Sequence, residues 1–537
     1  MIVCAIQINH QPSVCVIRND KVIWYKEERK LSGERHIKRA PYGCIDLLFK
    51  TKKFQVDKFV ITGYNYVEIE VSQVLQYLRY KNILLNNESG WSFHAFHHAA
   101  HAFKSYIDSG FKKARVFVVD GRGSDWYLTD KTETYETTSI YDFDENSVKC
   151  IYKKVWSKFK KDNNVTVDIN YHPSLNKDWI NEYKPLLVDN QTKFEIINNL
   201  DLGHFYAEVS ALFNFVEEEG KFMGYQSYGS FDKDVWNTIK EGVTEEQLKK
   251  LPKNKNTAAT CQIYFEKKYE ELVEKFKSDN MVFTGGTALN IINNYKLQKK
   301  FTDCNLWFDP LCGDEGTSIG GAYAYLYFNK QKIKPLDNVY LGGEIKKIDI
   351  KLHDGEKIIE NVETDKVVDL LNQGHVVGLI QGKSEGGPRA LGNRSLLLDP
   401  TLNDAKIKMN TIKNREPFRP FACSILEEKA GDYFEMLNIK QTPFMMHAPQ
   451  AKKLAKETIP SLVHVDGSCR IQTVNEKQNK VLYEILKKFK VPVIMNTSFN
   501  LSGFSIVENL EQVLYSFRNS NLKYVYFADL KVLLLKG

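Results

Sequence analysis

The sequence predicts an α/β protein with two domains, and three observations lead to this prediction. The chain has 537 residues, which are enough for two hydrophobic cores. Short apolar runs typical of buried strands, such as residues 376–380, alternate with longer segments of helical pattern, such as residues 205–216 and 262–277. Glycine-rich or polar motifs follow several of these runs, and loops after strands are where α/β proteins bind ligands.

Composition limits the class of protein. Hydrophobic residues make up 43% of the chain and charged residues 26%, which is ordinary for a soluble globular protein. A membrane helix needs about 18 or more uncharged apolar residues in a row, and no segment of the chain comes near this. The first ten residues predict a strand rather than a signal peptide. The nine cysteines form no CxxC pair, which indicates reduced thiols and a cytoplasmic location. The lack of a long apolar window leads us to expect no membrane partner. The net charge of +7 permits an anionic substrate or nucleic-acid contact but requires neither.

Strand patterns occur twice in the first half of the chain. Alternating apolar residues predict strands at 2–6, 13–18 and 22–25, with a polar turn at residues 9–12 between the first two. A second strand–turn–strand pattern follows at residues 116–126, and its turn contains Asp120 and Gly121. The two patterns together resemble the duplicated halves of an actin-like ATPase fold.

The domain boundary is expected near residue 340. Residues 330–335 are basic and poor in apolar side chains, which makes them the best linker candidate. The predicted domains are therefore residues 1–340 and 341–537. Residues 158–185 are polar and irregular, and they predict an excursion on the surface of the first domain.

An anion site is predicted in the second domain. Residues 386–395 (GGPRALGNRS) place two arginines and three glycines shortly after the apolar run 376–380. Arginine side chains match two-oxygen anions, and glycines let backbone N–H groups approach a phosphate. Three further segments, residues 413–419, Arg470 and residues 496–500, add basic and amide groups. The alternative is solvated surface charge, but the positions after buried strands favour one ligand site.

A metal site is predicted in the first domain from a window of four histidines, His94, His97, His98 and His101. Residues 95–106 have a helical pattern, so His97 and His101 lie one above the other on one face. His98 is rotated from His97 by about 100°. Asp314, in a glycine-flanked turn before a helical segment, is the best third ligand, and such a site keeps open positions for phosphate oxygens or an acceptor hydroxyl. The alternative is that these are packed core histidines.

Four motifs in the second half of the chain occur in this order: GGPRALGNRS, NREPFRPFA, HVDGSCRIQTV and NTSFN. In these motifs the chain resembles the C-terminal domain of the O-carbamoyltransferases of antibiotic and nodulation-factor biosynthesis. The N-terminal domain of that family is similar in five: HHAAHA, VVDGRG, EGKFMGYQSYG, TGGTALN and PLCGDEGTSIGGA. The resemblance implies an N-terminal actin-like ATPase (ASKHA) domain like that of the subunit that transfers threonylcarbamoyl groups onto tRNA. It also implies a C-terminal α/β domain of YrdC-like type that forms carbamoyl-adenylate.

The resemblance also implies roles for individual residues. It assigns His97, His101 and Asp314 to a divalent metal, Fe²⁺ or Mn²⁺. It places a nucleotide, ATP with Mg²⁺, near Asp120, Gly121, Lys221, Gly224, Gly285, Gly286 and Asn290. It assigns carbamoyl phosphate and catalysis to Arg389, Lys413, Arg419, Arg470, Ser498 and Asn500. The chain departs from the family at three places. Residues 225–227 are Tyr-Gln-Ser where Leu-Ala-Pro is usual, and Thr287 replaces a valine. The opening turn lacks the aspartate that is often seen there.

The implied reaction has two steps. ATP and carbamoyl phosphate give carbamoyl-adenylate in the C-terminal domain, and the carbamoyl group then passes to an acceptor hydroxyl at the metal site. The proton acceptor is either His98 or a metal-bound alkoxide. The acceptor is a small molecule, a nucleotide or DNA with a hydroxymethylated pyrimidine, and a homodimer is compatible with the sequence. A rival hypothesis, an actin-like ATPase that binds without transfer, does not explain the C-terminal arginines and lysine.

Overall fold

The computed structural model describes residues 1–51, 55–63, 68–81, 83, 91–92, 96–127, 133–158, 183–186 and 188–537. The chain forms two compact units. Unit 1 comprises residues 1–28, 36–289 and 303–337, and unit 2 comprises residues 29–35, 290–302 and 338–537. His94 and nearly all of the expected excursion at residues 158–185 lie outside the described residues.

Unit 1 contains two sheets with the same strand order. The first sheet runs β3-β2-β1-β4-β5, in which β2 is antiparallel to both β1 and β3, while β4 is parallel to both β1 and β5. Its strands are β1 (Ile2–Gln7), β2 (Ser13–Arg18), β3 (Lys21–Glu27), β4 (Lys58–Thr62) and β5 (Trp91–Ser92). The three strands expected at the start of the chain are confirmed.

The second sheet repeats this order as β9-β8-β6-β11-β12, with the same strand directions, and adds β10 beside β9. Its strands are β6 (Lys113–Val119), β8 (Glu133–Asp144), β9 (Val148–Trp156), β10 (Lys193–Ile197), β11 (Asn280–Thr284) and β12 (Asn305–Phe308), and β7 (Asp125–Tyr127) pairs with β8. The repeated topology confirms the two halves expected for an actin-like domain.

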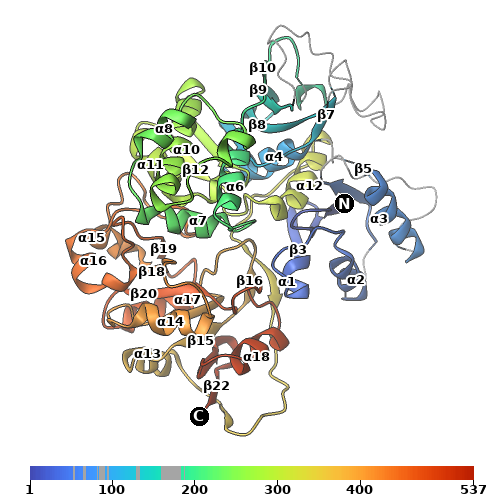
Figure 1. Cartoon of the computed structure of the whole chain (residues 1–537). Helices are drawn as coiled ribbons and strands as arrows, with labels where there is room; N and C mark the ends of the chain where they lie inside the picture. Colours follow the sequence, from blue (N-terminus) through green and yellow to red (C-terminus); the bar gives the residue numbers. More distant parts are fainter. Residues whose placement is uncertain are drawn as a thin grey trace. The chain divides into compact units, whose positions relative to one another are not determined.

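Two helices in contact lie between these sheets (Figure 1). Helix α12 (Thr317–Phe328) packs on β1, β2 and β4, and helix α4 (His97–Ser109) packs on β6, β8 and β11. The helix backbones approach closely at Gly320, where a Cβ atom would collide with the carbonyl oxygen of Ala100. The two helices therefore bring the ends of both sheets to one place.

A buried ion pair connects α4 to the loops at the ends of β11 and β12. Lys104, on α4, pairs with Asp309, and both side chains are at most 1% exposed. The carboxylate of Asp309 also accepts hydrogen bonds from the Thr284 hydroxyl (3.1 Å) and the Leu311 N–H (2.9 Å). Asp309 therefore orders the start of both loops that carry expected ligand-binding residues.

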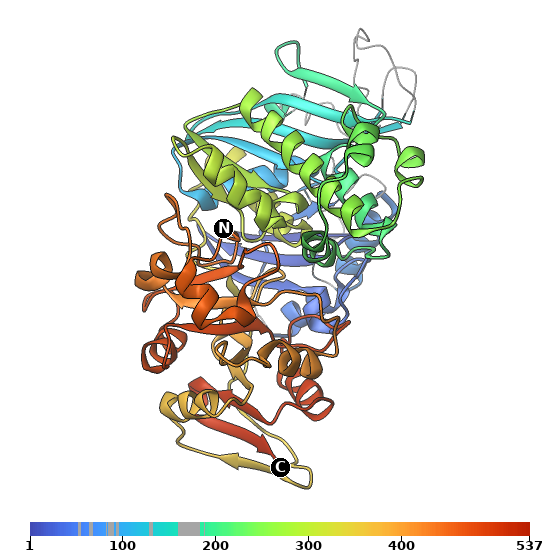
Figure 2. The ribbon, with the colours of Figure 1, turned by 60° about the vertical axis from the view of Figure 1, so that its left-hand side comes forward.

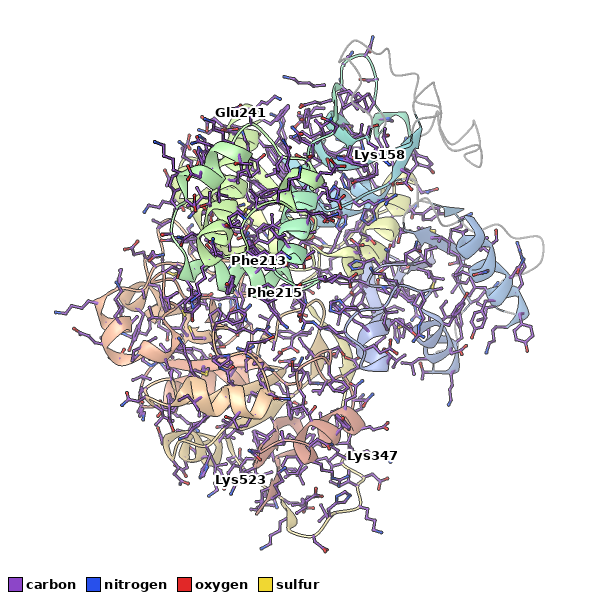
Figure 3. All side chains as sticks on the ribbon, viewed as in Figure 1. Lys158, Phe213, Phe215, Glu241, Lys347 and Lys523 are labelled. Atoms are coloured by element: carbon purple, nitrogen blue, oxygen red, sulfur yellow. The ribbon has the colours of Figure 1, made fainter. Side chains whose placement is uncertain are left out.

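The other helices of unit 1 lie mainly on its outer faces. They are α2 (Tyr42–Thr51), α3 (Glu68–Tyr80), α6 (Leu202–Leu212), α7 (Glu219–Tyr225), α8 (Lys233–Ile239), α9 (Glu245–Leu248) and α10 (Lys255–Lys275). Helix α10 packs against α6, α7 and α8. Phe213 and Phe215 follow α6 and contact the aromatic side chains of α7, and the exposed side chains of Lys158 and Glu241 mark the surface (Figure 3).

Unit 2 is built on one mixed sheet of eight strands in the order β14-β22-β21-β15-β17-β20-β18-β19. The strands β14 and β22 form one edge of this sheet (Figure 2). The strands are β14 (Glu356–Ile359), β15 (Val377–Ile380), β17 (Arg394–Leu398), β18 (Ala422–Leu426), β19 (Ile471–Val474), β20 (Val493–Ser498), β21 (Tyr524–Phe527) and β22 (Val532–Lys536). A separate pair joins β13 (Tyr340–Glu344) to β16 (Lys383–Glu385).

Alternate strand residues of unit 2 build two hydrophobic cores, one on each face of the sheet. One core packs against α13 (Thr364–Asn372) and α17 (Lys480–Lys488). The other packs against α14 (Ala405–Lys413), α15 (Ala430–Tyr433), α16 (Lys453–Thr458) and α18 (Leu510–Arg518). The short helix α1 (Glu28–Ser32) and α11 (Ile291–Lys300) complete the fold. Together with the sheets of unit 1, this confirms the predicted α/β class.

All nine cysteines are free and buried. Across the part of the chain that the structure describes, no helix combines the length and apolar character needed to span a membrane.

Candidate active site

Three predicted metal ligands meet in unit 1, and a fourth side chain joins them. The Nε2 atoms of His97 and His101 are 3.2 Å apart, and each lies 3.4 Å from Oδ1 of Asp314. Oδ2 of Asp120 lies 3.5 Å from Nε2 of His97 and 3.7 Å from Nε2 of His101. All four side chains are buried, and their ligand atoms lie within 4.8 Å of one another.

These distances fit a divalent cation. Ligand atoms about 2.1 Å from one ion are separated from each other by about 3.0–3.4 Å in octahedral or tetrahedral sites. Two imidazoles and two carboxylates are a donor set suited to Fe, Mn or Zn ions. In addition, Oδ2 of Asp120 accepts no hydrogen bond from any described residue, although it is buried.

The charges at this cluster favour a bound cation. Burial lowers the pKa of His97, but Asp314 and Asp120 outweigh this effect and raise the pKa to about 10. Burial raises the pKa of Asp314, but His97, His10 and His101 outweigh it and hold this pKa well below its usual value. Without another cation, two carboxylates thus keep a proton on His97, and a divalent ion would take the place of that proton.

His10 is a functional candidate that the sequence analysis missed. It lies in the turn between β1 and β2, where Asn9 and Gln11 both have positive φ angles of 79° and 47°. Its Nδ1 is 3.2 Å from Oδ2 of Asp314, and its side chain is 31% exposed. Because the carboxylate can only accept, Nδ1 donates and Nε2 is left as the basic nitrogen. The only sequence signal was the polar turn at residues 9–12 between the first two expected strands.

His98 lies in a different environment. It is fully buried, its Nδ1 is 2.9 Å from the Ser139 hydroxyl, and its ring packs so closely on Gly123 that a Cβ there would lie 2.6 Å from Nε2. Burial lowers the pKa of His98 to about 3. A neutral side chain without access to solvent is typical of packing, so these features argue against His98 as the proton acceptor.

Glycines let the loops expected to bind nucleotide come into contact. Gly285 has a φ of +83°, and a Cβ there would be 2.5 Å from the carbonyl oxygen of Val119. Asp120 Oδ1 accepts hydrogen bonds from the N–H groups of Gly121 and Gly286, both at 2.9 Å. The loops after β6 and β11 are therefore joined at Asp120, which belongs both to the expected nucleotide set and to the metal cluster.

The remaining expected nucleotide residues are more dispersed. Lys221 and Gly224 lie on α7, and Lys221 forms an ion pair with Glu218. Asn290 belongs to unit 2, where its side chain caps α11 by accepting the Asn293 N–H at 3.1 Å. The structure therefore brings Asp120, Gly121, Gly285 and Gly286 together and gives Asn290 a defined structural contact.

The predicted anion site is a cluster of cations in unit 2. The charges of Arg389, Arg415 and Arg419 lower the pKa of Arg470, although burial is the larger cause. Nε of Arg470 has no hydrogen-bond partner among the described residues. Arg419 lies 3.6 Å from Glu416. The loop after β16, the segment after α14 and the residue before β19 thus contribute to one cluster of cations.

Lys413, the last residue of α14, connects this cluster to the segment after β20. Its Nζ lies 2.7 Å from Oδ1 of Asn500 and 3.3 Å from Oγ of Ser498. Ser498 in turn donates to Oδ1 of Asn500 at 2.7 Å. Burial, followed by the charges of Arg415, Arg419 and Arg35, lowers the pKa of Lys413 well below its ordinary value. An anion bound here would reverse that effect.

Arg415 lies in the predicted basic run but was not assigned a role by sequence. Its guanidinium is 4.0 Å from the ring centroid of Phe421, and its Nε donates to Oδ1 of Asn410 at 3.0 Å. Burial and the charge of Arg419 lower its pKa to about 9, against the opposing effect of Glu416. Arg415 therefore adds to the unbalanced positive charge of the cluster.

The two arginines of residues 386–395 have different environments. Arg394 is fully buried, and its guanidinium donates to the backbone carbonyls of Gln381, Asn393, Gly343 and Gly382. Because these hydrogen bonds join Arg394 to the backbone, its role is structural. Arg389 lies in the loop between β16 and β17, close enough to Arg470 for its charge to act there.

Glu385 shapes the loop that carries Arg389. Its Oε1 accepts hydrogen bonds from the N–H groups of Leu391 (2.7 Å), Asn393 (2.9 Å) and Arg394 (3.2 Å). The carbonyl of Leu391 accepts from Gln472 and from the hydroxyl of Tyr340, both at 2.9 Å. Buried polar groups satisfied in this way hold one backbone conformation.

Comparisons with known proteins define the class. The carbamoyltransferase N-terminus model matches residues 239–323, and the carbamoyltransferase C-terminus model matches residues 368–533. The first range contains Gly285, Gly286 and Asp314, and the second contains the whole cation cluster. The class is that of an enzyme that transfers carbamoyl groups.

The relatives agree with this class. An uncharacterized protein of Methanocaldococcus jannaschii is 33% identical over 62% of this chain and 72% of its own length. Nodulation protein NolO of Bradyrhizobium diazoefficiens is 32% identical over 45% of this chain and 47% of its own length, so the match spans about half of NolO. The chain belongs to the carbamoyltransferase family. HypF of T. kodakarensis is 11% identical over 61% of this chain and 48% of its own length, with a TM-score of 0.35.

Proposed function

We propose that this protein is an ATP-dependent O-carbamoyltransferase that uses carbamoyl phosphate and forms carbamoyl-adenylate before transfer to an acceptor hydroxyl. The observation that carries the proposal is the cation cluster of unit 2. Its members lower one another's pKa, and Nε of Arg470 has no hydrogen-bond partner among the described residues. Such a cluster is stabilised by a multiply charged anion, and phosphate groups of carbamoyl phosphate and ATP are anions of that kind.

In the first step, carbamoyl phosphate and water give carbamate and phosphate. A carbamate oxygen then attacks the α-phosphorus of ATP, with Mg²⁺ on its phosphates, and releases pyrophosphate. Arg389, Arg419 and Arg470 neutralise phosphate charge in this proposal, and Lys413 donates hydrogen bonds to it once an anion restores its proton. Ser498 and Asn500, already joined to Lys413, supply neutral polar groups for the carbamoyl oxygen.

In the second step, the acceptor oxygen attacks the carbamoyl carbon and AMP leaves. We assign removal of the hydroxyl proton to Nε2 of His10, because Asp314 holds Nδ1 and the side chain is partly exposed. Burial lowers the pKa of His10, but Asp314, Glu217 and Asp120 outweigh this effect and raise the pKa. A divalent cation held by His97, His101, Asp120 and Asp314 would supply Lewis acidity next to this proton acceptor.

The test is a transfer assay with carbamoyl phosphate labelled in its carbon. The protein, ATP and Mg²⁺ are offered hydroxylated metabolites, nucleotides, and DNA with hydroxymethylated pyrimidines as separate arms. We expect one class of acceptor to take up label, with one pyrophosphate released per carbamoyl group. If the parent protein releases no pyrophosphate from ATP, the proposal is contradicted.

A matched pair of variants assigns the activity to the cluster. Arg389→Ala should abolish carbamoyl phosphate-dependent pyrophosphate release, since a charge-assisted contact contributes about 1.5–3 kcal/mol to binding alone. Lys383→Ala changes an exposed residue on the strand before the same loop and should keep parental activity. Equal activity of the two variants would exclude Arg389 from the site.

A further inference from the structure

The first N–H groups of helix α4 are bound by side chains from other segments. The N-cap residue, Phe96, supplies no side-chain hydrogen bond. Instead, the N–H of His97 donates to Oγ of Ser124 at 3.0 Å, and the N–H of His98 donates to Oε1 of Glu136 at 3.2 Å. Since the first N–H groups of a helix have no partner within it, these two acceptors fix where α4 begins.

Glu136 also holds the loop that follows Asp120. Its Oε1 accepts the N–H of Ser124 at 3.0 Å, and its carbonyl oxygen accepts the N–H of Gly123 at 2.8 Å. One carboxylate oxygen is thus shared by two segments. The first segment contains His97 and His101, the second contains Asp120, and together they supply three of the four candidate metal ligands.

Lys153 holds the second oxygen of the same carboxylate. It lies on β9 and pairs with Oε2 of Glu136 on β8, and both side chains are 1% exposed. Its Nζ is also 3.5 Å from the hydroxyl of Tyr141. A buried carboxylate costs free energy unless it is paired, and this pairing leaves Oε1 free to accept both N–H groups.

We propose that Glu136, held by Lys153, is a positioning residue that fixes His97, His101 and Asp120 in the geometry of one metal site. The inference rests on the proposed function, because it requires a metal at this cluster. The essential property is the hydrogen-bond acceptor at Oε1, and the charge of the pair serves to place it. Residues that hold metal ligands in this way affect both the affinity and the coordination geometry of the ion.

Two double variants separate the acceptor from the charge. Glu136→Gln/Lys153→Met removes the ion pair but keeps an acceptor at position 136, whereas Glu136→Leu/Lys153→Met removes the acceptor as well. Each is titrated with Co²⁺ alone, and the visible absorption of bound Co²⁺ reports the coordination geometry. We expect the first variant to resemble the parent, and the second to bind Co²⁺ about 10–100-fold more weakly with an altered spectrum.

Lys154→Met is the matched control. Lys154 is the next residue on β9 and pairs with Asp201 rather than with Glu136, so this variant should keep the parental affinity and spectrum. Equal Co²⁺ affinities and equal spectra for the two double variants would overturn the positioning role of Glu136 but not the metal site. A parent protein that binds no Co²⁺ would contradict the metal site itself and the positioning role with it.

A third variant is used if Glu136→Leu/Lys153→Met does not fold. If Glu136→Leu/Lys153→Met gives no cooperative thermal unfolding, Glu136→Asp replaces it, since it keeps the charge but withdraws the acceptor by one methylene group. We expect weaker Co²⁺ binding with an altered spectrum. An unchanged spectrum and affinity for Glu136→Asp would overturn the inference.

Discussion

At the scale of single residues, the site depends on charges that the protein leaves unbalanced. Lys413 shows this best, because burial and three arginines lower its pKa. Among the described residues, its Nζ donates hydrogen bonds to neutral oxygens of Ser498 and Asn500. At pH values between this lowered pKa and the ordinary value of 10.5, the unfolded chain binds more protons than the folded protein. The contribution of Lys413 to the free energy of unfolding therefore increases with pH in that window.

Anion binding at Lys413 should be coupled to proton uptake. A phosphate dianion next to the amine raises its pKa, so the protein takes up a proton when the ligand binds. Calorimetric titration with inorganic phosphate, in two buffers of different ionisation enthalpy and at a pH where phosphate is already a dianion, measures this uptake. Lys413→Met should bind phosphate more weakly and without the uptake. Lys408→Met, at a partly exposed position on the same helix, should behave as the parent.

At the scale of elements, short backbone contacts and loop-capping side chains set the geometry. The crossing of α4 and α12 has room only for glycine at position 320. The loop that carries Arg389 has its conformation set by Glu385, whose Oε1 accepts three backbone N–H groups. Each of these features predicts an effect that a matched variant can isolate.

Gly320→Ala should lower the free energy of unfolding by about 1–3 kcal/mol, the usual cost of overpacking a core. The added methyl group meets the carbonyl of Ala100, and each helix is also packed against its own sheet. Gly220→Ala in α7, where a Cβ meets nothing within 4 Å, should instead raise stability by up to about 1 kcal/mol. Urea unfolding of both variants measures the two changes, and effects of the same sign would refute this account of the crossing.

Glu385→Leu should weaken phosphate binding by at least about tenfold, because a single charge-assisted contact of Arg389 contributes about 1.5–3 kcal/mol. The variant leaves the N–H groups of Leu391, Asn393 and Arg394 without their acceptor, so the loop loses its fixed conformation. Glu385→Gln keeps an acceptor and should bind phosphate nearly as the parent does. Calorimetry measures both affinities, and a parental affinity for Glu385→Leu would show that the loop holds its shape without this residue.

At the scale of the whole molecule, the two steps of the proposed reaction would take place in different units. The cation cluster lies within unit 2, and the candidate metal ligands lie within unit 1. Unit 2 also includes residues 29–35 and 290–302, which come from the first part of the chain. The division of the chain in space is therefore not the same as its division in sequence.

Asp314→Ala should separate the two steps. It removes a candidate metal ligand and the partner of His10 in unit 1, but it leaves the cation cluster of unit 2 unchanged. We expect pyrophosphate release that still depends on carbamoyl phosphate, with no label transferred to any acceptor. Loss of both activities with an unchanged thermal unfolding midpoint would contradict the assignment of the steps to separate units.

The sequence by itself determined the features that depend on local periodicity and on chain order. Apolar runs predicted the first three strands of one sheet in unit 1 and the strand β6 of the other, and helical spacing placed His97 above His101. Basic motifs pointed to Arg389, Lys413, Arg419 and Arg470 as anion-binding candidates. The strand and helix predictions succeed because side-chain direction along a helix or strand repeats with a fixed period. The α/β class and the repeated halves followed from the same patterns.

Only the tertiary structure decided which distant groups meet. It added His10 and Asp120 to the histidine pair, buried His98, and assigned Arg394 to backbone carbonyls while Arg389 joined the cation cluster. Pairing of this kind depends on crossover connections and on close approaches such as Gly320 against Ala100, and no local period encodes them. The chemistry of each residue was therefore visible in the sequence, but its partner was set by the fold.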